Sequence, residues 1–127
     1  MRPNDLKYTP EHEWVRLEGG TATVGITDYA QEQLTDIVFV ELPEIGKRVK
    51  AGDNLAVVES VKSVSDVFSP LDGEVSAVNS ALEKSPEKVN ASPFGDGWIA
   101  KLKVANPNLS ELMDAAAYEK FVAELGH

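Results

Sequence analysis

The sequence predicts a mainly β fold, a sandwich or barrel of short strands with one short internal helix and a C-terminal helix. Two observations carry this prediction: short apolar runs recur through residues 6–105, and segments rich in Gly, Pro, Asn and Asp separate them. Such spacing is typical of antiparallel strands joined by tight turns. A chain of 127 residues suffices for one hydrophobic core, so we expect a single domain over residues 1–127.

The strands are expected where apolar residues are dense or alternate with polar ones. Between these runs lie residues that permit positive φ or preset a turn, as in the segments EGG, SPLDG and NASPFGDG. The pattern predicts strands over residues 13–18, 21–26, 38–43, 54–61, 63–70, 73–79 and 98–104.

The internal helix is expected just after residue 26. Thr27 is suited to cap it, and Asp28 in the first turn complements the positive end of the helix dipole. The apolar residues of this segment fall on one helical face: Tyr29, Ala30 and Leu34.

The C-terminal helix is expected over about residues 108–125. Asn108 and Glu111 have the spacing of a capping box. Beyond them apolar residues recur with helical period up to Gly126: Tyr118, Phe121, Val122 and Leu125.

The charge balance favours protein partners over nucleic acid. The chain has 12 Lys and Arg against 21 Asp and Glu, a formal charge of −9. Phosphate backbones require a basic surface, whereas an acidic one suits solubility and attraction to basic proteins. No apolar run approaches the roughly 20 residues that span a bilayer, and the first residues lack the apolar stretch of a signal peptide. We therefore expect no nucleic-acid binding, no membrane segment and a cytoplasmic location.

The chain contains no cysteine and only two histidines, His12 and His127. Disulfides and thiolate metal sites are therefore excluded, and these histidines are not the i, i+4 pair of a zinc protease. We expect no metal site. Any thiol chemistry must come from an attached group.

One lysine lies at the centre of ESVKSVSD, residues 59–66, between two β-like runs where the chain must reverse. Tight hairpins usually recruit Asn-Gly, Asp-Gly or Gly, because their turns need positive φ. Here Val61, Lys62 and Ser63 occupy the tip. An exposed lysine is most often a solvated charge. The missing turn residues favour instead a tip that is shaped for recognition by another protein.

The amine of Lys62 can be acylated by an activated carboxylate, which removes its charge and lengthens the side chain. A lysine that acts as a nucleophile needs burial or a neighbouring cation. The charged residues near Lys62 in sequence are the acids Glu59 and Asp66. The pattern therefore indicates a lysine that outside enzymes modify, and we expect no catalytic residue.

The whole chain resembles the H-protein family of the glycine cleavage system from about Leu6 to Leu125. Three stretches carry the resemblance: ESVKSVSDVFSPLDGEV, YTPEHEWVRLEGGTATVGITDYAQEQLTDIVFVELPEIG and NASPFGDGWIAKL. It implies a lipoyl/biotinyl-domain-like barrel-sandwich hybrid. The core would cover about residues 22–104, with extra N-terminal strands and the helical segment over about 108–125.

The resemblance also implies that Lys62 carries lipoate in amide linkage. The enzymes that attach lipoate would recognise the hairpin around it, which places Glu59, Ser60, Val61 and Ser63 in the recognised segment.

A second implied site is a pocket for the loaded arm, whose amine end is cationic and prone to hydrolysis. Glu13 and Asp66 match family positions associated with this pocket, and Glu11 falls where some relatives carry Ser. Folding the arm against carboxylates would exclude water and hold the ammonium.

Members of this family are carriers and not enzymes. The resemblance implies that the lipoyl arm accepts an aminomethyl group from the pyridoxal-phosphate-dependent glycine decarboxylase and delivers it to the tetrahydrofolate-dependent aminomethyltransferase. Dihydrolipoamide dehydrogenase then reoxidises the arm. These three enzymes and the lipoyl-attaching enzymes are the implied partners.

Several alternatives remain open at this point. A lipoyl reservoir, or an H-like carrier for another pathway, would have the same features. A biotin carrier is disfavoured because its lysine typically lies between two methionines, whereas Val61 and Ser63 flank Lys62. An enzyme with Lys62 as nucleophile lacks a nearby base, and an interaction module with an unmodified lysine is the simplest option.

Overall fold

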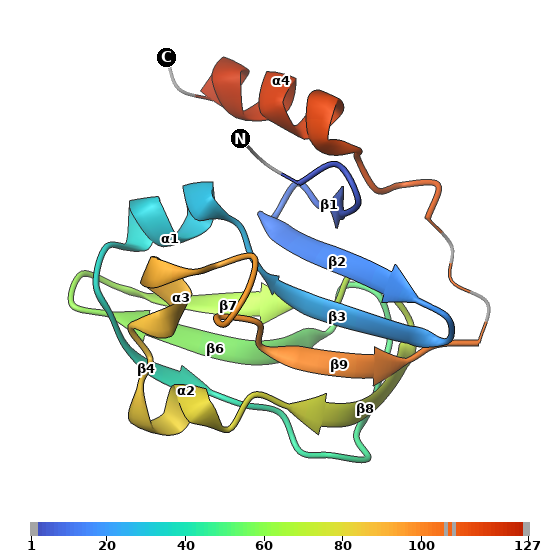
Figure 1. The fold of residues 1–127 in the computed structure, drawn as a ribbon, viewed down its shortest axis with the longest axis horizontal. Coiled ribbons are helices and arrows are strands. Elements are labelled where there is room, and N and C mark those ends of the chain that lie inside the picture. The colour runs from blue at the N-terminus through green and yellow to red at the C-terminus, as the bar shows by residue number, and fades with distance from the viewer. Residues whose placement is uncertain (1–2, 106, 108, 126–127) are drawn as a thin grey trace.

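The computed structural model describes residues 3–105, 107 and 109–125, in which two antiparallel sheets face each other (Figure 1). The larger sheet has the order β1-β2-β3-β9-β8-β5, and the smaller has the order β4-β6-β7. The strands are β1 (Lys7–Tyr8), β2 (Glu13–Glu18), β3 (Thr21–Ile26), β4 (Ile37–Glu41), β5 (Arg48–Val49), β6 (Asn54–Ser60), β7 (Val64–Phe68), β8 (Gly73–Val78) and β9 (Ala100–Lys103). The helices are α1 (Asp28–Leu34), α2 (Ala81–Lys84), α3 (Lys88–Ala91) and α4 (Ala115–Leu125).

The main hydrophobic core lies between the two sheets. Alternate residues of a strand point to opposite faces, so each strand contributes every second side chain to it. Val15 and Val24 reach this core from the larger sheet, and Val58 and Val67 reach it from the smaller one. The expected mainly β architecture is therefore confirmed.

A second, smaller core lies beneath α4, on the other side of β2. It contains Leu6, Tyr8, Trp14, Ala115 and Tyr118, all buried. Trp14 belongs here because it lies between Glu13 and Val15 on β2 and points to the opposite face from them. The N-terminal residues and the C-terminal helix thus share one core, as their proximity in Figure 1 indicates.

The internal helix forms where the sequence predicts it. Thr27 is its N-cap, and its hydroxyl accepts a hydrogen bond from the Ala30 backbone N at 3.2 Å. In the described part of the chain, no helix combines the length and the apolar character needed to cross a membrane.

The prediction for the start of the C-terminal helix was wrong. The helix begins at Ala115, and Asp114 caps it by accepting a hydrogen bond from the Ala117 N at 2.8 Å. Met113 exchanges two backbone hydrogen bonds of 2.8 Å with Tyr8, so it is held in a bridge to β1 and does not join the helix. The Leu112 N donates to the Leu109 carbonyl at 3.1 Å, which closes a separate turn before this bridge. Asn108, expected to cap it, and Gly126 lie outside the described residues.

The seven predicted strands are all present, and β2 and β3 have the predicted bounds. Each of the other five is one to three residues shorter overall, and β4 begins one residue before its predicted start. The two-residue strands β1 and β5 and the one-turn helices α2 and α3 were not predicted. Elements this short have too few residues to show a period.

Gly25 explains how Trp14 fits against the sheet, because the two residues are register partners on β2 and β3. A Cβ at Gly25 would lie 2.6 Å from Cζ2 of the Trp14 ring. We expect Gly25→Ala to lower the free energy of unfolding by about 2 kcal/mol through overpacking, measured by urea denaturation. Gly20→Ala is the matched control, since its Cβ would meet only the Val104 carbonyl oxygen at 3.5 Å. Equal losses in both variants would contradict this explanation.

Candidate functional site

Lys62 lies at the tip of the hairpin formed by β6 and β7. The last paired residues before the turn are Glu59 and Val64, which places the lysine at the outer end of the smaller sheet. Its side chain is exposed, and within the described residues it makes no hydrogen bond or ion pair. The amine is therefore open to an approaching enzyme.

The turn is closed by the Ser60 side chain together with a backbone hydrogen bond from the Ser60 N to the Ser63 carbonyl at 2.8 Å, and not by residues with positive φ. Ser60 Oγ accepts hydrogen bonds from the backbone N of Lys62 at 3.1 Å and of Ser63 at 2.9 Å, and donates to the Ser63 carbonyl at 3.1 Å. Serine hydroxyls can stand in for backbone groups in this way. The bonds of the Ser60 hydroxyl thus explain why this turn needs no glycine. Ser60 is buried, so only Val61, Ser63 and Glu59 of the predicted recognition residues are exposed.

The tip of the hairpin is held by the segment between α1 and β4. The Val61 backbone N donates to the Asp36 carbonyl at 3.0 Å. Asn90 of α3 braces the same segment: its Nδ2 donates to the Thr35 carbonyl at 2.8 Å, and its Oδ1 accepts from the Ile37 N at 2.9 Å. A rigid support of this kind fixes where the lysine is presented.

The outer face of the smaller sheet presents apolar and acidic side chains side by side. Phe39, Glu59 and Val64 are register partners on neighbouring strands, so they form one row across the sheet. Phe39 is 47% exposed and Val64 is 64% exposed, and Val61 beside them is 69% exposed. Exposed apolar side chains next to one functional group are typical of a surface that contacts proteins.

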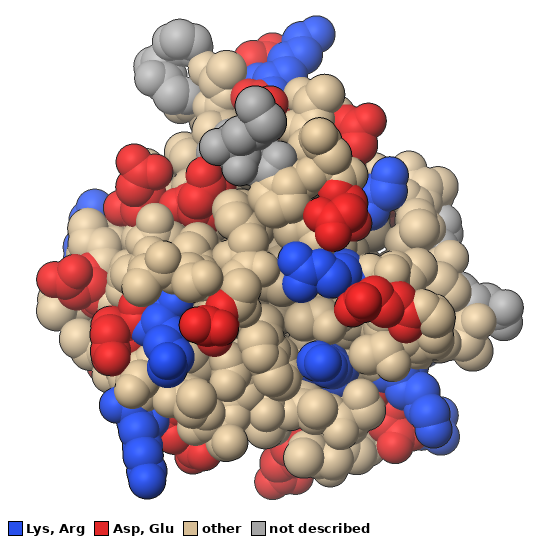
Figure 2. Space-filling view, in the orientation of Figure 1, with Lys and Arg blue, Asp and Glu red and all other residues tan. Residues whose placement is uncertain are grey.

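Over the face of the molecule in Figure 2, basic and acidic side chains are interspersed. Within the described residues, no group of three His, Asp or Glu side chains could hold a metal ion.

Glu13 is buried, with 2% of its side chain exposed, and its carboxylate joins the two sheets. Its Oε1 accepts a hydrogen bond from the Thr9 hydroxyl at 2.6 Å. Its Oε2 accepts one from the Phe68 backbone N at 3.1 Å, at the end of β7. Since β7 is an edge strand of the smaller sheet, Glu13 satisfies a donor that no neighbouring strand can reach.

Burial raises the pKa of Glu13 from its ordinary 4.5 to about 7. The two hydrogen bonds, from Thr9 and Phe68, oppose this rise by stabilising the charged form, and the negative charge of Glu11 adds to it. Close to neutral pH the carboxyl therefore exchanges readily between its charged and neutral forms.

Asp66 and Glu11, the other two predicted pocket residues, are exposed. Asp66 lies two residues before Phe68 on β7, so both point to the same side of the strand, about 7 Å apart along it. Glu11 belongs to the short loop before β2, and its backbone N donates to the Thr9 hydroxyl at 3.2 Å. Glu13 thus lies at the end of β7, and Glu11 is close enough for its charge to act on the Glu13 carboxyl.

The model of the Glycine cleavage H-protein family matches residues 6–125. The chain belongs to this family. Two relatives named glycine cleavage system H protein are closely similar. That of Parvibaculum lavamentivorans is 59% identical over 123 residues, covering 96% of this chain and 98% of the relative. That of Symbiobacterium thermophilum is 55% identical over 123 residues, covering 96% of each chain.

A solved structure supports the same assignment. The crystal structure of a glycine cleavage system H protein from Mycobacterium marinum superposes with a TM-score of 0.87 at 36% identity. It covers 99% of this chain and 100% of the other. The agreement extends over the whole H-protein fold, including the N-terminal strands and the C-terminal helix.

Several residues of this H-protein site could not be found from the sequence. Thr9 and the Phe68 backbone N bind the Glu13 carboxylate, and Asn90 supports the hairpin from more than 25 positions away along the chain. Nothing in the local pattern marks Asn90. The TPEHE segment before β2 does indicate a role for Thr9, since threonine hydroxyls in turns often form hydrogen bonds with nearby residues.

Glu13 should make stability depend on pH. Because its pKa in the folded protein is raised, folding favours the protonated form, and this contribution is lost as the pH rises from about 4.5 to about 7. The shift corresponds to about 3 kcal/mol. We expect the unfolding free energy of Glu13→Gln, measured in urea, to fall less over this range than that of the unsubstituted protein. Parallel profiles would show that Glu13 titrates normally.

Proposed function

We propose that this H-family protein is the lipoyl carrier of a glycine cleavage system, with lipoate attached to Lys62. The observation that carries the proposal is the exposed amine at the tip of a braced hairpin, in a chain that belongs to the family from residue 6 to residue 125. The carrier itself has no catalytic role in the proposal. Its partners are glycine decarboxylase, the aminomethyltransferase, dihydrolipoamide dehydrogenase and the enzymes that attach lipoate.

The local structure around Lys62 fits an attached acyl group. The amine is exposed, and Ser60 holds the turn without engaging the side chain of the lysine. When bound, lipoate would supply the disulfide and thiol chemistry that a cysteine-free chain lacks. The exposed row of Phe39, Glu59 and Val64 gives the attaching enzymes a surface to contact beside the tip.

The role of Glu13 in this proposal is to hold the cationic end of a loaded arm. Its carboxylate lies at the end of β7 away from Lys62, and Asp66 lies between them on the same strand. An arm that lies along this free edge would meet Asp66 first and Glu13 last. Glu11, in the loop before β2, adds negative charge near the Glu13 carboxyl. A docked ammonium would thus be paired and shielded from the water that hydrolyses it.

A reservoir that passes lipoate to other carriers, or a carrier for another pathway, would share the same lysine. The buried Glu13 favours the glycine cleavage role, because an acid beside the arm serves a cargo that carries an amine. A biotin carrier has no comparable need for such an acid.

The attachment site can be tested by intact mass. Protein produced in cells that make lipoate is expected to carry a lipoyl mass increment, and Lys62→Arg is expected to remove it completely. Lys84→Arg, at an exposed lysine on α2, is the control and should retain the increment. A lipoyl increment on the Lys62 variant would contradict the proposed attachment.

The pocket can be tested on protein loaded with the aminomethyl group. Glu13→Gln is expected to be lipoylated normally and to lose its cargo faster, because an amide cannot pair with the ammonium. Loss of one charge-assisted hydrogen bond predicts an increase of about tenfold or more in the rate of formaldehyde release. Glu44→Gln, at an exposed acid outside the site, is the control. Equal release rates in all three proteins would remove Glu13 from the pocket.

A further inference from the structure

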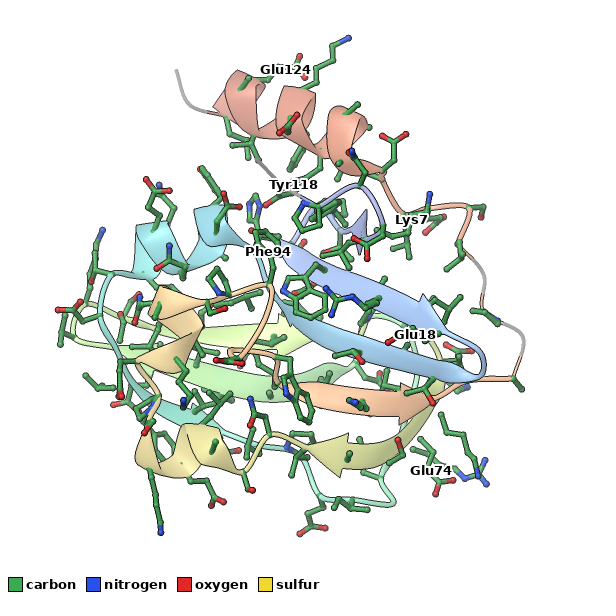
Figure 3. The ribbon with its side chains drawn as sticks, viewed as in Figure 1. Lys7, Glu18, Glu74, Phe94, Tyr118 and Glu124 are labelled. Carbon is green, nitrogen blue, oxygen red and sulfur yellow. The ribbon has the colours of Figure 1, made fainter. Side chains whose placement is uncertain are left out.

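Tyr118 of α4 connects two segments that the sequence separates widely. It is fully buried, and Figure 3 shows it beneath α4, between that helix and the start of β2. Its hydroxyl lies 2.8 Å from Nδ1 of His12 and 2.7 Å from the Thr27 hydroxyl. A buried tyrosine that only filled the core would need one partner for its hydroxyl. Here the hydroxyl ties the loop before β2 to the residue that caps α1.

His12 is in a backbone conformation that needs support. Its φ is 70°, in the left-handed region that costs free energy for any residue with a side chain. The rings of Tyr118, Tyr29 and Phe121 surround it, with centroids 5.8, 4.7 and 6.0 Å away. Because the Tyr118 hydroxyl fixes the imidazole of His12, this hydroxyl also favours the left-handed backbone conformation of His12.

The conformation of His12 decides where Glu13 points. The His12 N donates to the Thr9 carbonyl at 3.0 Å, and the Thr9 N donates to the Glu13 carbonyl at 2.9 Å, which closes a tight loop. Within this loop the Thr9 hydroxyl reaches the Glu13 carboxylate. The reversal at His12 thus directs the next side chain inward, to the backbone N of Phe68.

The second partner of Tyr118 leads toward the lysine. Thr27 caps α1 through its hydroxyl, and its backbone N donates to the His12 carbonyl at 3.0 Å. The segment after α1 then provides the Asp36 carbonyl that binds Val61, next to Lys62. The Tyr118 hydroxyl therefore contacts both His12, which precedes Glu13, and Thr27, which caps the helix before the segment that holds the hairpin.

We propose that Tyr118 is a positioning residue of the arm pocket, whose hydroxyl holds His12 and thereby aims the Glu13 carboxyl at the edge of β7. The inference deepens the proposed function and rests on it for the part that concerns the arm. The positioning itself is a property of the unmodified chain. Tyr118→Phe removes one hydroxyl and leaves the ring, which stacks on Tyr8 at a centroid distance of 4.8 Å.

The first experiment uses the full unmodified chain. The pH midpoint of Glu13 is followed by NMR through its side-chain carboxyl carbon and the Phe68 amide. In Tyr118→Phe we expect the midpoint to fall by about half a unit or more toward the ordinary value of a glutamate, because a loosened loop admits water to the carboxyl. Tyr8→Phe is the matched control: it removes the hydroxyl that donates to the Pro3 carbonyl at 2.7 Å, and its midpoint should stay unchanged.

The second experiment uses the lipoylated, loaded protein. Tyr118→Phe should release its aminomethyl group about fivefold faster than Tyr8→Phe, the effect of losing one neutral hydrogen bond that supports the pocket. If Tyr118→Phe does not fold, His12→Asn takes its place. Asparagine tolerates the left-handed backbone but lacks the imidazole, so the same two changes are expected.

The outcomes separate the two proposals. An unchanged Glu13 midpoint in folded Tyr118→Phe or His12→Asn overturns the positioning role, whatever the arm does. A shifted midpoint with an unchanged release rate supports the positioning role and rejects the part of the proposed function that gives Glu13 to the arm. A shift in both supports both.

Discussion

The hydrogen bond between the Glu13 carboxylate and the backbone N of Phe68 is the contact on which the arrangement of this protein depends. It joins the first long strand of the larger sheet to the free edge of the smaller one. A backbone donor at a sheet edge would otherwise face solvent or another chain. By using an acid here, the fold satisfies this one donor and places a titratable group at the end of the strand that starts beside Lys62.

This choice has a cost in stability that an amide would avoid. Burial of a carboxyl is unfavourable unless it is hydrogen-bonded or protonated, and the raised pKa of Glu13 shows that the two hydrogen bonds compensate only in part. A glutamine could accept the same bond from Phe68. Because the acid is less favourable for folding at neutral pH than at low pH, its presence is better explained by a need for negative charge than by stability.

The sequence predicted the long elements, in which one pattern repeats over many residues, and it predicted the position of Lys62. The alternation in residues 54–66 predicted the hairpin, and Lys62 lies at its tip in the structure. The way the turn closes was not predicted, because the hydroxyl of Ser60 replaces the glycine that a tight turn usually needs, and local sequence does not show where a side chain will bond. The start of α4 was misplaced for a similar reason, since pairing between Met113 and Tyr8 is a long-range contact.

The three acids proposed for the arm pocket also differ in how far the sequence predicts their surroundings. Glu13, Glu11 and Asp66 were proposed from resemblance, and the composition does not indicate that Glu13 is buried while the other two are exposed. That difference follows from the strand face: Glu13 shares the inward side of β2 with Val15, which lies in the main core. Thr9, Phe68 and Tyr118 act on it through contacts that only the folded chain creates.

Burial of Glu13 also sets how strongly a cationic cargo could be held. An ion pair at an exposed site contributes roughly 0–1 kcal/mol, too little to protect a labile group for long. A buried carboxylate interacts more strongly, but it must first lose its proton. With a pKa of about 7 this deprotonation costs under about 1 kcal/mol at neutral pH, and about 3 kcal/mol at pH 5. The Glu13 carboxyl would thus combine stronger pairing with a modest cost of charging, the combination that the proposed pocket for a loaded arm requires.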